Sequence, residues 1–212
     1  MPMIKVLIAD DHSVVRVGLR QILSGIRDIA VIDEAANAIE VLEKVKKNDY
    51  SVVILDIAMP GKSGLDALKE IKIERPKLPV LILSMYPEDQ YAIRVLRAGA
   101  AGYMTKDSAP DELVTAVRIV AEGRKYVSPT FAEILALNLD TDREKELHEL
   151  LSDREYEVLC MIASGKTLSE IAGLLFLSVK TISTYRSRIL EKMHLKNNAE
   201  LTSYAIQNHL IE

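Results

Sequence analysis

The chain has 212 residues, 49% of them hydrophobic and 27% charged, which suits two small domains or one medium one and excludes a disordered chain. Its formal net charge of −4 argues against a uniformly basic nucleic-acid coat but leaves room for a basic patch on one element. The single cysteine, Cys160, cannot form an internal disulfide, and no Cys/His cluster has zinc-site spacing.

The N-terminus leads directly into a strand-like segment at Ile4 and has neither the apolar core nor the cleavage site of a signal peptide. No apolar run reaches the roughly 18 residues that a membrane-spanning helix needs. We therefore expect a cytoplasmic protein that does not associate with membranes.

Two periodicities alternate over residues 1–124. Runs that are apolar at nearly every position are typical of strands buried on both faces of a parallel sheet. Five such runs lie at Ile4–Ala9, Ile29–Asp33, Val52–Leu55, Val80–Leu83 and Gly102–Met104. The segments between them place apolar residues at helical spacing, for example Leu113, Val117 and Val120. Strands alternating with helices in this way predict an α/β domain with a doubly wound parallel sheet.

The strand signals stop after Gly123. Ser128 and Pro129 are residue types preferred at the N-cap and first position of a helix, which we expect to end near Leu139. Residues 140–149 are rich in acidic side chains and are predicted to be solvated. Residues 125–149 are therefore interpreted as a helical and acidic linker.

Every segment from residue 150 to residue 212 has helical character. Ser152 and Glu155 fit a capping box at the start of a helix that stops near Gly165. Three further helices are expected at Leu168–Leu175, Val179–Met193 and Ala199–Asn208. The second domain is therefore predicted to be an all-α unit of four helices.

Acidic side chains end two of the predicted strands. Asp10 and Asp11 follow the first strand and Asp56 follows the third, and these strands are neighbours in a sheet of order 2-1-3-4-5. Carboxylates sharing a crevice raise at least one pKa unless a cation lies between them, and Mg²⁺ prefers such oxygen ligands. The alternative is that the aspartates only cap helices and line loops.

Two more polar groups are expected at the same edge of the sheet. Ser84 ends the fourth strand, and Lys106 follows the fifth. A carboxylate, a metal ion, an ammonium and a hydroxyl together suit phosphoryl transfer, with Asp56 as the nucleophile and the Ala58 carbonyl free to bind the metal. His12 follows the acidic pair and could be a metal ligand as well, but a capping or solvent-exposed role is favoured.

Positive charge is concentrated in the predicted helix Val179–Met193. Its apolar residues repeat at core spacing, and the opposite side carries Lys180, Ser183, Thr184, Ser187 and Arg188. Small hydroxyls flanked by cations suit a DNA major groove, and a short turn at residues 176–178 joins this helix to the previous one, as in a helix-turn-helix. The alternative is an amphipathic helix with a solvated charged face.

The segments Ile8–His12, Leu55–Gly64 and Gly102–Lys106 resemble the receiver domain of two-component response regulators, over residues 4 to about 122. The resemblance implies a flavodoxin-like fold and phosphorylation of Asp56 by a sensor histidine kinase. It assigns Mg²⁺ to Asp10, Asp11, Asp56 and the Ala58 carbonyl, a phosphate oxygen to Lys106, and switch roles to Ser84 and Tyr103. For Tyr103 the alternative is a half-buried strand aromatic. No required receiver residue is missing, which disfavours a receiver that works without phosphorylation.

Residues 150 to about 209 resemble the DNA-binding domain of the NarL/FixJ (LuxR-type) regulators. The resemblance rests on Leu151–Glu155, Glu170–Ala172, Leu177–Ile182 and Lys192–Met193. It implies that the third helix reads DNA and that the fourth can form a dimer contact. The candidate DNA-binding residues are Lys180, Thr181, Ser183, Thr184, Ser187, Arg188 and Lys192. Tyr185 stands where many relatives carry histidine.

These patterns predict a DNA-binding transcriptional response regulator with a receiver at 1–124, a linker at 125–149 and a helix-turn-helix domain at 150–212. Phosphorylation is expected to control homodimerisation and binding to double-stranded DNA. We do not expect an enzyme, because a phosphatase with an aspartyl nucleophile would need a second acid where Ala58 stands, and no catalytic residue beyond Asp56 is predicted. A module that dimerises through its helices without binding DNA is the other alternative.

Overall fold

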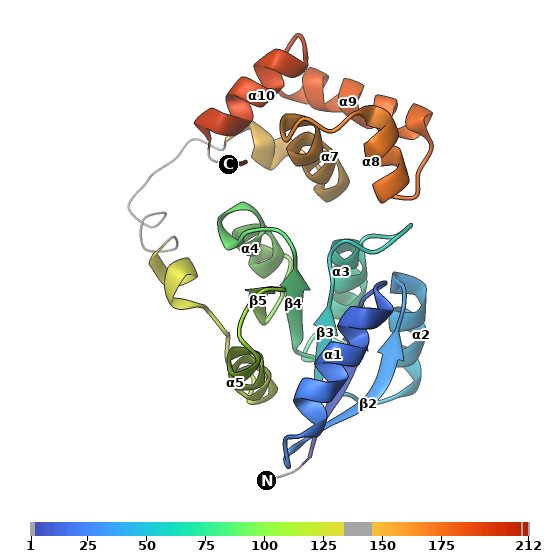
Figure 1. Cartoon of the computed structure of the whole chain (residues 1–212), viewed down its shortest axis with the longest axis vertical. Coiled ribbons are helices and arrows are strands. Elements are labelled where there is room, and N and C mark those ends of the chain that lie inside the picture. Colours follow the sequence, from blue (N-terminus) through green and yellow to red (C-terminus); the bar gives the residue numbers. More distant parts are fainter. Residues whose placement is uncertain (1–2, 134–145, 209, 212) are drawn as a thin grey trace. The chain divides into compact units, whose positions relative to one another are not determined.

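The computed structural model describes residues 3–133, 146–208 and 210–211, and the chain divides into two compact units, Met1–Leu135 and Ala136–Glu212 (Figure 1). Within these residues no helix has both the length and the apolarity needed to cross a bilayer. The two units are described separately below.

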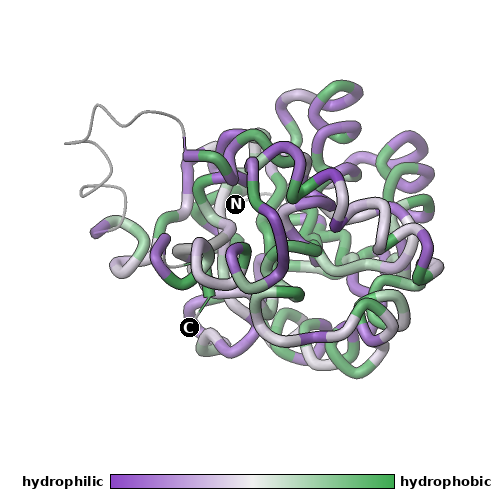
Figure 2. Tube along the Cα trace, turned by 90° about the horizontal axis from the view of Figure 1, so that it is seen from above, coloured by the Kyte–Doolittle hydropathy of each residue, from purple (hydrophilic) through white to green (hydrophobic). Residues whose placement is uncertain are grey.

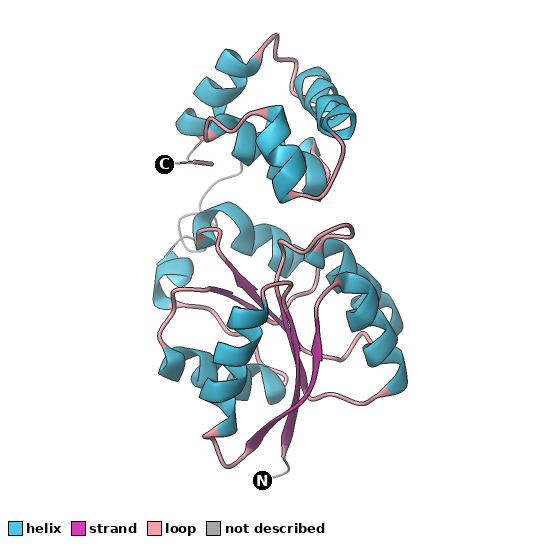
Figure 3. Ribbon diagram, turned by 45° about the vertical axis from the view of Figure 1, so that its right-hand side comes forward, coloured by secondary structure: helices cyan, strands magenta, loops and turns pink. Residues whose placement is uncertain are grey.

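The first unit has the predicted α/β fold. Its strands are β1 (Ile4–Ala9), β2 (Ile29–Ala35), β3 (Val52–Leu55), β4 (Val80–Ser84) and β5 (Gly102–Thr105). They form one parallel sheet in the order β2-β1-β3-β4-β5, as expected. The helices are α1 (Ser13–Ser24), α2 (Ala38–Lys47), α3 (Gly64–Glu74), α4 (Glu88–Arg97) and α5 (Pro110–Ala121). Helices cover both faces of the sheet (Figure 3).

Burial on both faces explains why the strands lack an alternating pattern. Val6 and Ile8 of β1 belong to a core shared with Leu23 of α1 and Val117 of α5. Leu7 between them is fully buried too, although it points to the opposite side of the sheet. A sheet buried in this way fixes which strand ends lie side by side, and that edge carries the candidate site.

The chain returns to the sheet after α5. The N–H of Tyr126 donates to the carbonyl of Ala101 (2.8 Å), and Tyr126 forms a parallel bridge with Gly102 of β5. A Cβ on Gly102 would lie 2.9 Å from Cβ of Tyr126, so this close approach requires glycine. The buried Tyr126 ring joins the core between α1 and α5. Residues 125–133, which the sequence assigns to the linker, therefore pack with the first unit.

Ser128 caps a short helical segment at residues 129–133. Its hydroxyl accepts a hydrogen bond from the N–H of Phe131 (3.0 Å), which confirms the predicted N-cap. The expected end of this helix near Leu139 and the acidic residues 140–145 lie outside the described residues.

The second unit is all-α, as predicted. It comprises a 3-10 turn, η1 (Leu147–Leu150), and helices α7 (Asp153–Ala163), α8 (Leu168–Leu174), α9 (Val179–Lys192) and α10 (Asn198–Gln207). Hydrophilic and hydrophobic stretches alternate along its helices (Figure 2), as expected for helices with one apolar face. The capping box of Ser152 and Glu155 is confirmed, and Thr167 with Glu170 forms a second one on α8.

The start of the second unit is held against its last helix. Nδ1 of His148, in η1, lies 3.1 Å from the hydroxyl of Tyr204 in α10. The His148 ring also packs against Tyr156 of α7, with ring centroids 5.9 Å apart. Leu147 and His148, which the sequence assigns to a solvated linker, are thus part-buried in the second unit, whereas Glu149 is exposed as predicted.

Candidate functional site

The polar residues predicted at the strand ends meet at one edge of the sheet. Ala9 of β1 is paired in register with Leu55 of β3, so Asp10 and Asp56, which follow them, come out side by side. The N–H of Asp56 donates to the carbonyl of Ala9 (2.8 Å). At the other side, Ser84 ends β4, and its carbonyl accepts a hydrogen bond from the N–H of Lys106 (2.8 Å).

The ammonium of Lys106 lies between two buried carboxylates. Nζ of Lys106 is 2.6 Å from Oδ2 of Asp10 and 2.7 Å from Oδ2 of Asp56, and each aspartate is only 1% exposed. Burial raises the pKa of Asp56, and the nearby Lys106 offsets only part of that effect. Burial also works to lower the pKa of Lys106, but Asp56 and Asp10 outweigh it and raise that pKa. The buried cluster therefore contains two carboxyl groups, those of Asp10 and Asp56, beside one ammonium, that of Lys106.

The donor set fits a divalent cation. Asp10, Asp11, His12 and Asp56 each offer an atom within 4.8 Å of the others. Three carboxylates, those of Asp10, Asp11 and Asp56, gather around a single ammonium, so the cluster carries an excess of negative charge. Excess negative charge on carboxylate oxygens is what a hard cation such as Mg²⁺ requires.

The loop after Asp56 is fixed by backbone contacts. The N–H of Ala58 donates to Oδ1 of Asp56 (3.2 Å), and the N–H of Gly64 donates to the carbonyl of Ile57 (2.9 Å). A Cβ on Gly64 would lie 1.8 Å from the carbonyl oxygen of Asp56, so only glycine permits this approach. Ser63 then caps α3 by accepting from the N–H of Asp66.

The candidate switch residues, Ser84 and Tyr103, both hydrogen-bond to the backbone of Tyr86. Ser84 is fully buried, and its hydroxyl accepts a hydrogen bond from the N–H of Tyr86 (3.2 Å). The hydroxyl of Tyr103 donates to the carbonyl of Tyr86 (2.6 Å), and the Tyr103 side chain is buried. The Tyr86 ring stacks on Tyr91 of α4, with centroids 4.6 Å apart. The Tyr103 ring is therefore held in a buried position in this structure, so the alternative of a half-buried strand aromatic does not describe its exposure.

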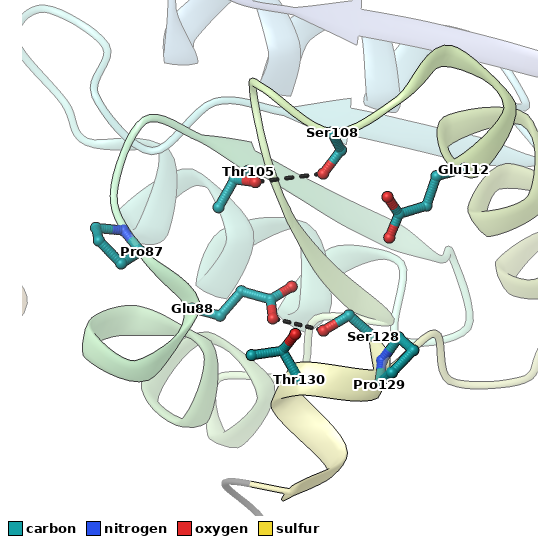
Figure 4. Close-up of a pocket in the computed structure, with 8 residues that line it drawn as sticks. All are labelled: Pro87, Glu88, Thr105, Ser108, Glu112, Ser128, Pro129 and Thr130. Atoms are coloured by element: carbon teal, nitrogen blue, oxygen red, sulfur yellow. Dashed lines mark hydrogen bonds between the residues drawn. The ribbon is translucent and has the colours of Figure 1, made fainter.

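A pocket lies where α4, the end of β5, α5 and residues 128–130 meet (Figure 4). The hydroxyl of Ser128 donates to the carboxylate of Glu88 at the start of α4, and the hydroxyl of Tyr126 donates to Glu112 of α5. The segment after α5 is thus bonded to both flanking helices. Sequence reasoning missed Glu88, because its partner lies 40 residues away and leaves no local pattern.

The predicted hydroxyl and basic residues of α9 share one exposed face. Lys180, Ser183, Thr184, Ser187 and Arg188 are exposed, whereas Ile182 and Ile189 are buried on the other side. A shallow pocket on this face is lined by Ser178, Lys180, Thr181, Thr184, Tyr185 and Arg188. Ser178 caps α9, and its hydroxyl also contacts that of Thr181 (2.8 Å). The helix therefore presents cations and short hydroxyls together.

Two cations of α9 are engaged within the unit. Nζ of Lys192 lies 2.6 Å from Oε2 of Glu155, the buried glutamate of the α7 capping box. The guanidinium of Arg186 donates to the side chain of Asn198 in α10 (2.6 Å). Lys192, predicted to contact DNA, is thus placed beside an acidic partner of its own unit.

Comparisons with known families match both units. The family model of the response regulator receiver domain matches residues 6–118. The model of the bacterial regulatory proteins of the luxR family matches residues 149–205. The chain belongs to the two-component response regulators with a LuxR-type DNA-binding domain. This response regulator is a member of a family of transcription regulators rather than enzymes, as the sequence predicts.

Similar proteins cover nearly the full length of this response regulator. The oxygen regulatory protein NreC of Staphylococcus carnosus is 39% identical over 98% of this chain and 99% of its own. The response regulator UvrY of Escherichia coli is 36% identical over 98% and 96%. RcsB of Salmonella enterica serovar Typhimurium, solved on the promoter rprA with the phosphomimetic BeF3−, is 30% identical with a TM-score of 0.66 over 95% and 98%. A further RcsB structure holds two dimers on two parallel DNAs, at 30% identity and a TM-score of 0.60 over 96% and 98%.

The raised pKa of Asp56 gives a stability prediction. A carboxyl that binds its proton more tightly in the folded state costs stability once the pH exceeds its ordinary pKa of 3.8, and the cost is complete above the raised pKa. Asp56→Asn removes that cost and leaves Lys106 its contact with Asp10. Without metal, we expect Asp56→Asn to have a higher urea midpoint of unfolding than the unsubstituted chain. The difference between the two midpoints should grow as the pH rises from 4 and then level off.

The control for this experiment is Asp49→Asn, since Asp49 is exposed and pairs with Arg75 at the surface. Its urea midpoint is expected to follow the unsubstituted chain at every pH. A lower midpoint for Asp56→Asn at neutral pH would mean that the ionised Asp56 stabilises the fold, contrary to the burial argument.

Proposed function

We propose that Asp56 accepts a phosphoryl group from a phosphohistidine of a sensor kinase and that the phosphorylated receiver controls DNA binding by the helical domain. The observation that carries the proposal is the meeting of Asp10, Asp56, Ser84 and Lys106 at adjacent strand ends. An acceptor carboxylate, a fixed ammonium and a hydroxyl in one crevice supply what phosphoryl transfer needs.

In the proposed reaction a carboxylate oxygen of Asp56 attacks phosphorus, and the bond between phosphorus and the histidine nitrogen breaks. Lys106 is positioned to neutralise one phosphoryl oxygen, and the Ser84 hydroxyl can donate to another. Mg²⁺, when bound, would neutralise further charge on the phosphoryl group. Asp10, Asp11, Asp56 and the Ala58 carbonyl would hold it.

The acceptor is tested by intact mass after incubation with acetyl phosphate and Mg²⁺. We expect one phosphoryl adduct on the unsubstituted chain and none on Asp56→Ala. The adduct should persist in Asp49→Ala, which removes an exposed carboxylate far from the crevice. An adduct that survives Asp56→Ala would assign the acceptor to another residue.

The helical domain is proposed to bind double-stranded DNA through the exposed face of α9. Lys180, Ser183, Thr184, Ser187 and Arg188 support this role by their shared exposure, with Thr181 at the edge of the face. The cations would contact phosphates and the hydroxyls base edges. RcsB, whose structures are described as dimers and as promoter-bound, supports a homodimer on DNA. We propose that the protein acts in the cytoplasm.

Substitutions on α9 test the DNA proposal. Lys180→Ala and Arg188→Ala should weaken binding to every duplex and lower the slope of log affinity against log salt by about one each, because each removes one phosphate contact. Lys192→Ala serves as the comparison, since its partner is Glu155. We expect it to lower the urea midpoint with little change in the salt slope.

Other results of these substitutions would change the proposed DNA-binding face of α9. A drop in salt slope for Lys192→Ala alone would move the DNA-binding face toward the end of α9. Unchanged affinity in Lys180→Ala and Arg188→Ala would mean that DNA is bound by a face other than this one. No measurable affinity for duplex DNA in the unsubstituted chain would favour a module that dimerises without binding DNA.

We propose that the signal leaves the receiver through α4 and the segment after α5. A phosphoryl group that accepts a hydrogen bond from the Ser84 hydroxyl would draw the Ser84 oxygen toward itself and away from the N–H of Tyr86, which donates to that oxygen. The carbonyl of the same Tyr86 accepts from Tyr103. Tyr86 precedes α4, and Glu88 at the start of α4 is bonded to Ser128. A shift of Tyr86 would therefore move Glu88 and, through the bond to Glu88, Ser128 at the beginning of the linker.

Glu88→Ala tests this route without altering the crevice or α9. We expect the phosphoryl adduct to form normally while the gain in DNA affinity on phosphorylation falls, because the bond to Ser128 is lost. Glu122→Ala is the matched control, since Glu122 is an exposed glutamate that pairs with Arg124 at the end of α5. A full gain in Glu88→Ala, measured as the ratio of affinities with and without phosphate, would exclude the Glu88–Ser128 contact from the route.

A further inference from the structure

His12 turns its ring toward the acidic crevice. It occupies the N-cap position of α1, but its side chain makes no capping hydrogen bond. Instead its Nδ1 lies 2.9 Å from Oδ1 of Asp11 and 3.3 Å from Oδ1 of Asp10. The side chain is 66% exposed, so burial does not force it into this position.

The separations match those of ligands on one metal ion. In an octahedral site with bonds of about 2.1 Å, neighbouring ligand atoms are about 3.0 Å apart and opposite ones about 4.2 Å. Nδ1 of His12 is at neighbour distance from one oxygen of Asp11 and from one of Asp10. The four atoms from Asp10, Asp11, His12 and Asp56 lie within 4.8 Å of one another, so small movements would bring them onto one ion.

The two sides of the crevice are chemically different. Lys106 contacts the Oδ2 atoms of Asp10 and Asp56, on the inner side. The Oδ1 atoms of Asp10 and Asp11 face the His12 ring, on the solvent side. A cation entering from solvent would therefore meet an imidazole nitrogen together with carboxylate oxygens, whereas Lys106 would remain on the far side.

We propose that His12 is a metal ligand that extends this site from Mg²⁺ to divalent transition metals that prefer nitrogen, such as Ni²⁺. The proposal rests on the proposed Mg²⁺ site and adds one residue to it. Mg²⁺ prefers oxygen ligands and keeps several waters, so it gains little from an imidazole. Ni²⁺ binds imidazole well and stands higher in the order of divalent affinities.

The test measures Ni²⁺ and Mg²⁺ affinities of the tag-free full chain by calorimetric titration. His12→Gln should weaken Ni²⁺ binding by about tenfold or more, since losing even an outer partner of a metal ligand costs that much. Mg²⁺ affinity should change less than about twofold, because Mg²⁺ gains little from a nitrogen ligand. His194→Gln, which removes another exposed histidine, should alter neither affinity.

Asp11→Asn shows whether the two ions share the site, and it should weaken both. Equal losses of Ni²⁺ and Mg²⁺ affinity in His12→Gln, or an unchanged Ni²⁺ affinity, would overturn the role of His12. Ni²⁺ binding that survives Asp11→Asn would place that ion elsewhere and overturn it too. Failure of the unsubstituted chain to bind Mg²⁺ would instead overturn the proposed Mg²⁺ site, and this proposal with it.

Discussion

The contact of one lysine ammonium with two buried aspartates holds the receiver edge together. Lys106 follows β5, Asp10 follows β1 and Asp56 follows β3, so a single cation links the ends of three strands. Removing charged groups from water costs several kcal/mol for each ion unless partners compensate. Three carboxylates against one ammonium leave that compensation incomplete. The crevice is therefore stable enough to fold and still short of positive charge, and this imbalance would attract a cation.

A series of hydrogen bonds connects the crevice to α4. Ser84 and Tyr86 continue β4 toward α4, and Tyr103 lies one strand away with its hydroxyl on the Tyr86 carbonyl. Any group that enters the crevice and engages Ser84 meets a chain of hydrogen bonds rather than a loose loop. The helical unit has a comparable arrangement on α9, where the hydroxyls of Thr184 and Ser187 bond to carbonyls one turn earlier in their own helix. Base contacts would have to share or replace those bonds.

Local patterns predicted most of the fold and most of the crevice. Strands that are apolar throughout identified the buried sheet, and the in-register pairing of β1 with β3 brings Asp10 and Asp56 together as the strand order implied. The capping residues Ser128 and Ser152 were also predicted correctly, because a helix cap depends on neighbours within a single turn.

Contacts between distant segments were not predictable in this way. One such contact joins Ser128 to Glu88, 40 positions away, and another joins His148 to Tyr204, 56 positions away. The sequence around these residues contains no pattern that identifies the partner. The contact of Lys192 with Glu155 joins residues 37 positions apart and was likewise not predicted from the sequence.

The return of Tyr126 to the sheet has a consequence for how the receiver can be isolated. β5 is an outer strand, and an outer strand with unpaired N–H and C=O groups is a template for association with another chain. Tyr126 occupies one such group on Ala101 and fills the adjoining core with its ring. A fragment cut at residue 124 would lose both, leaving an uncovered edge beside an apolar hole. A fragment extended to residue 133 would keep the Tyr126 hydrogen bond and the Tyr126 ring in place. Such a fragment is the better choice for a soluble monomeric receiver.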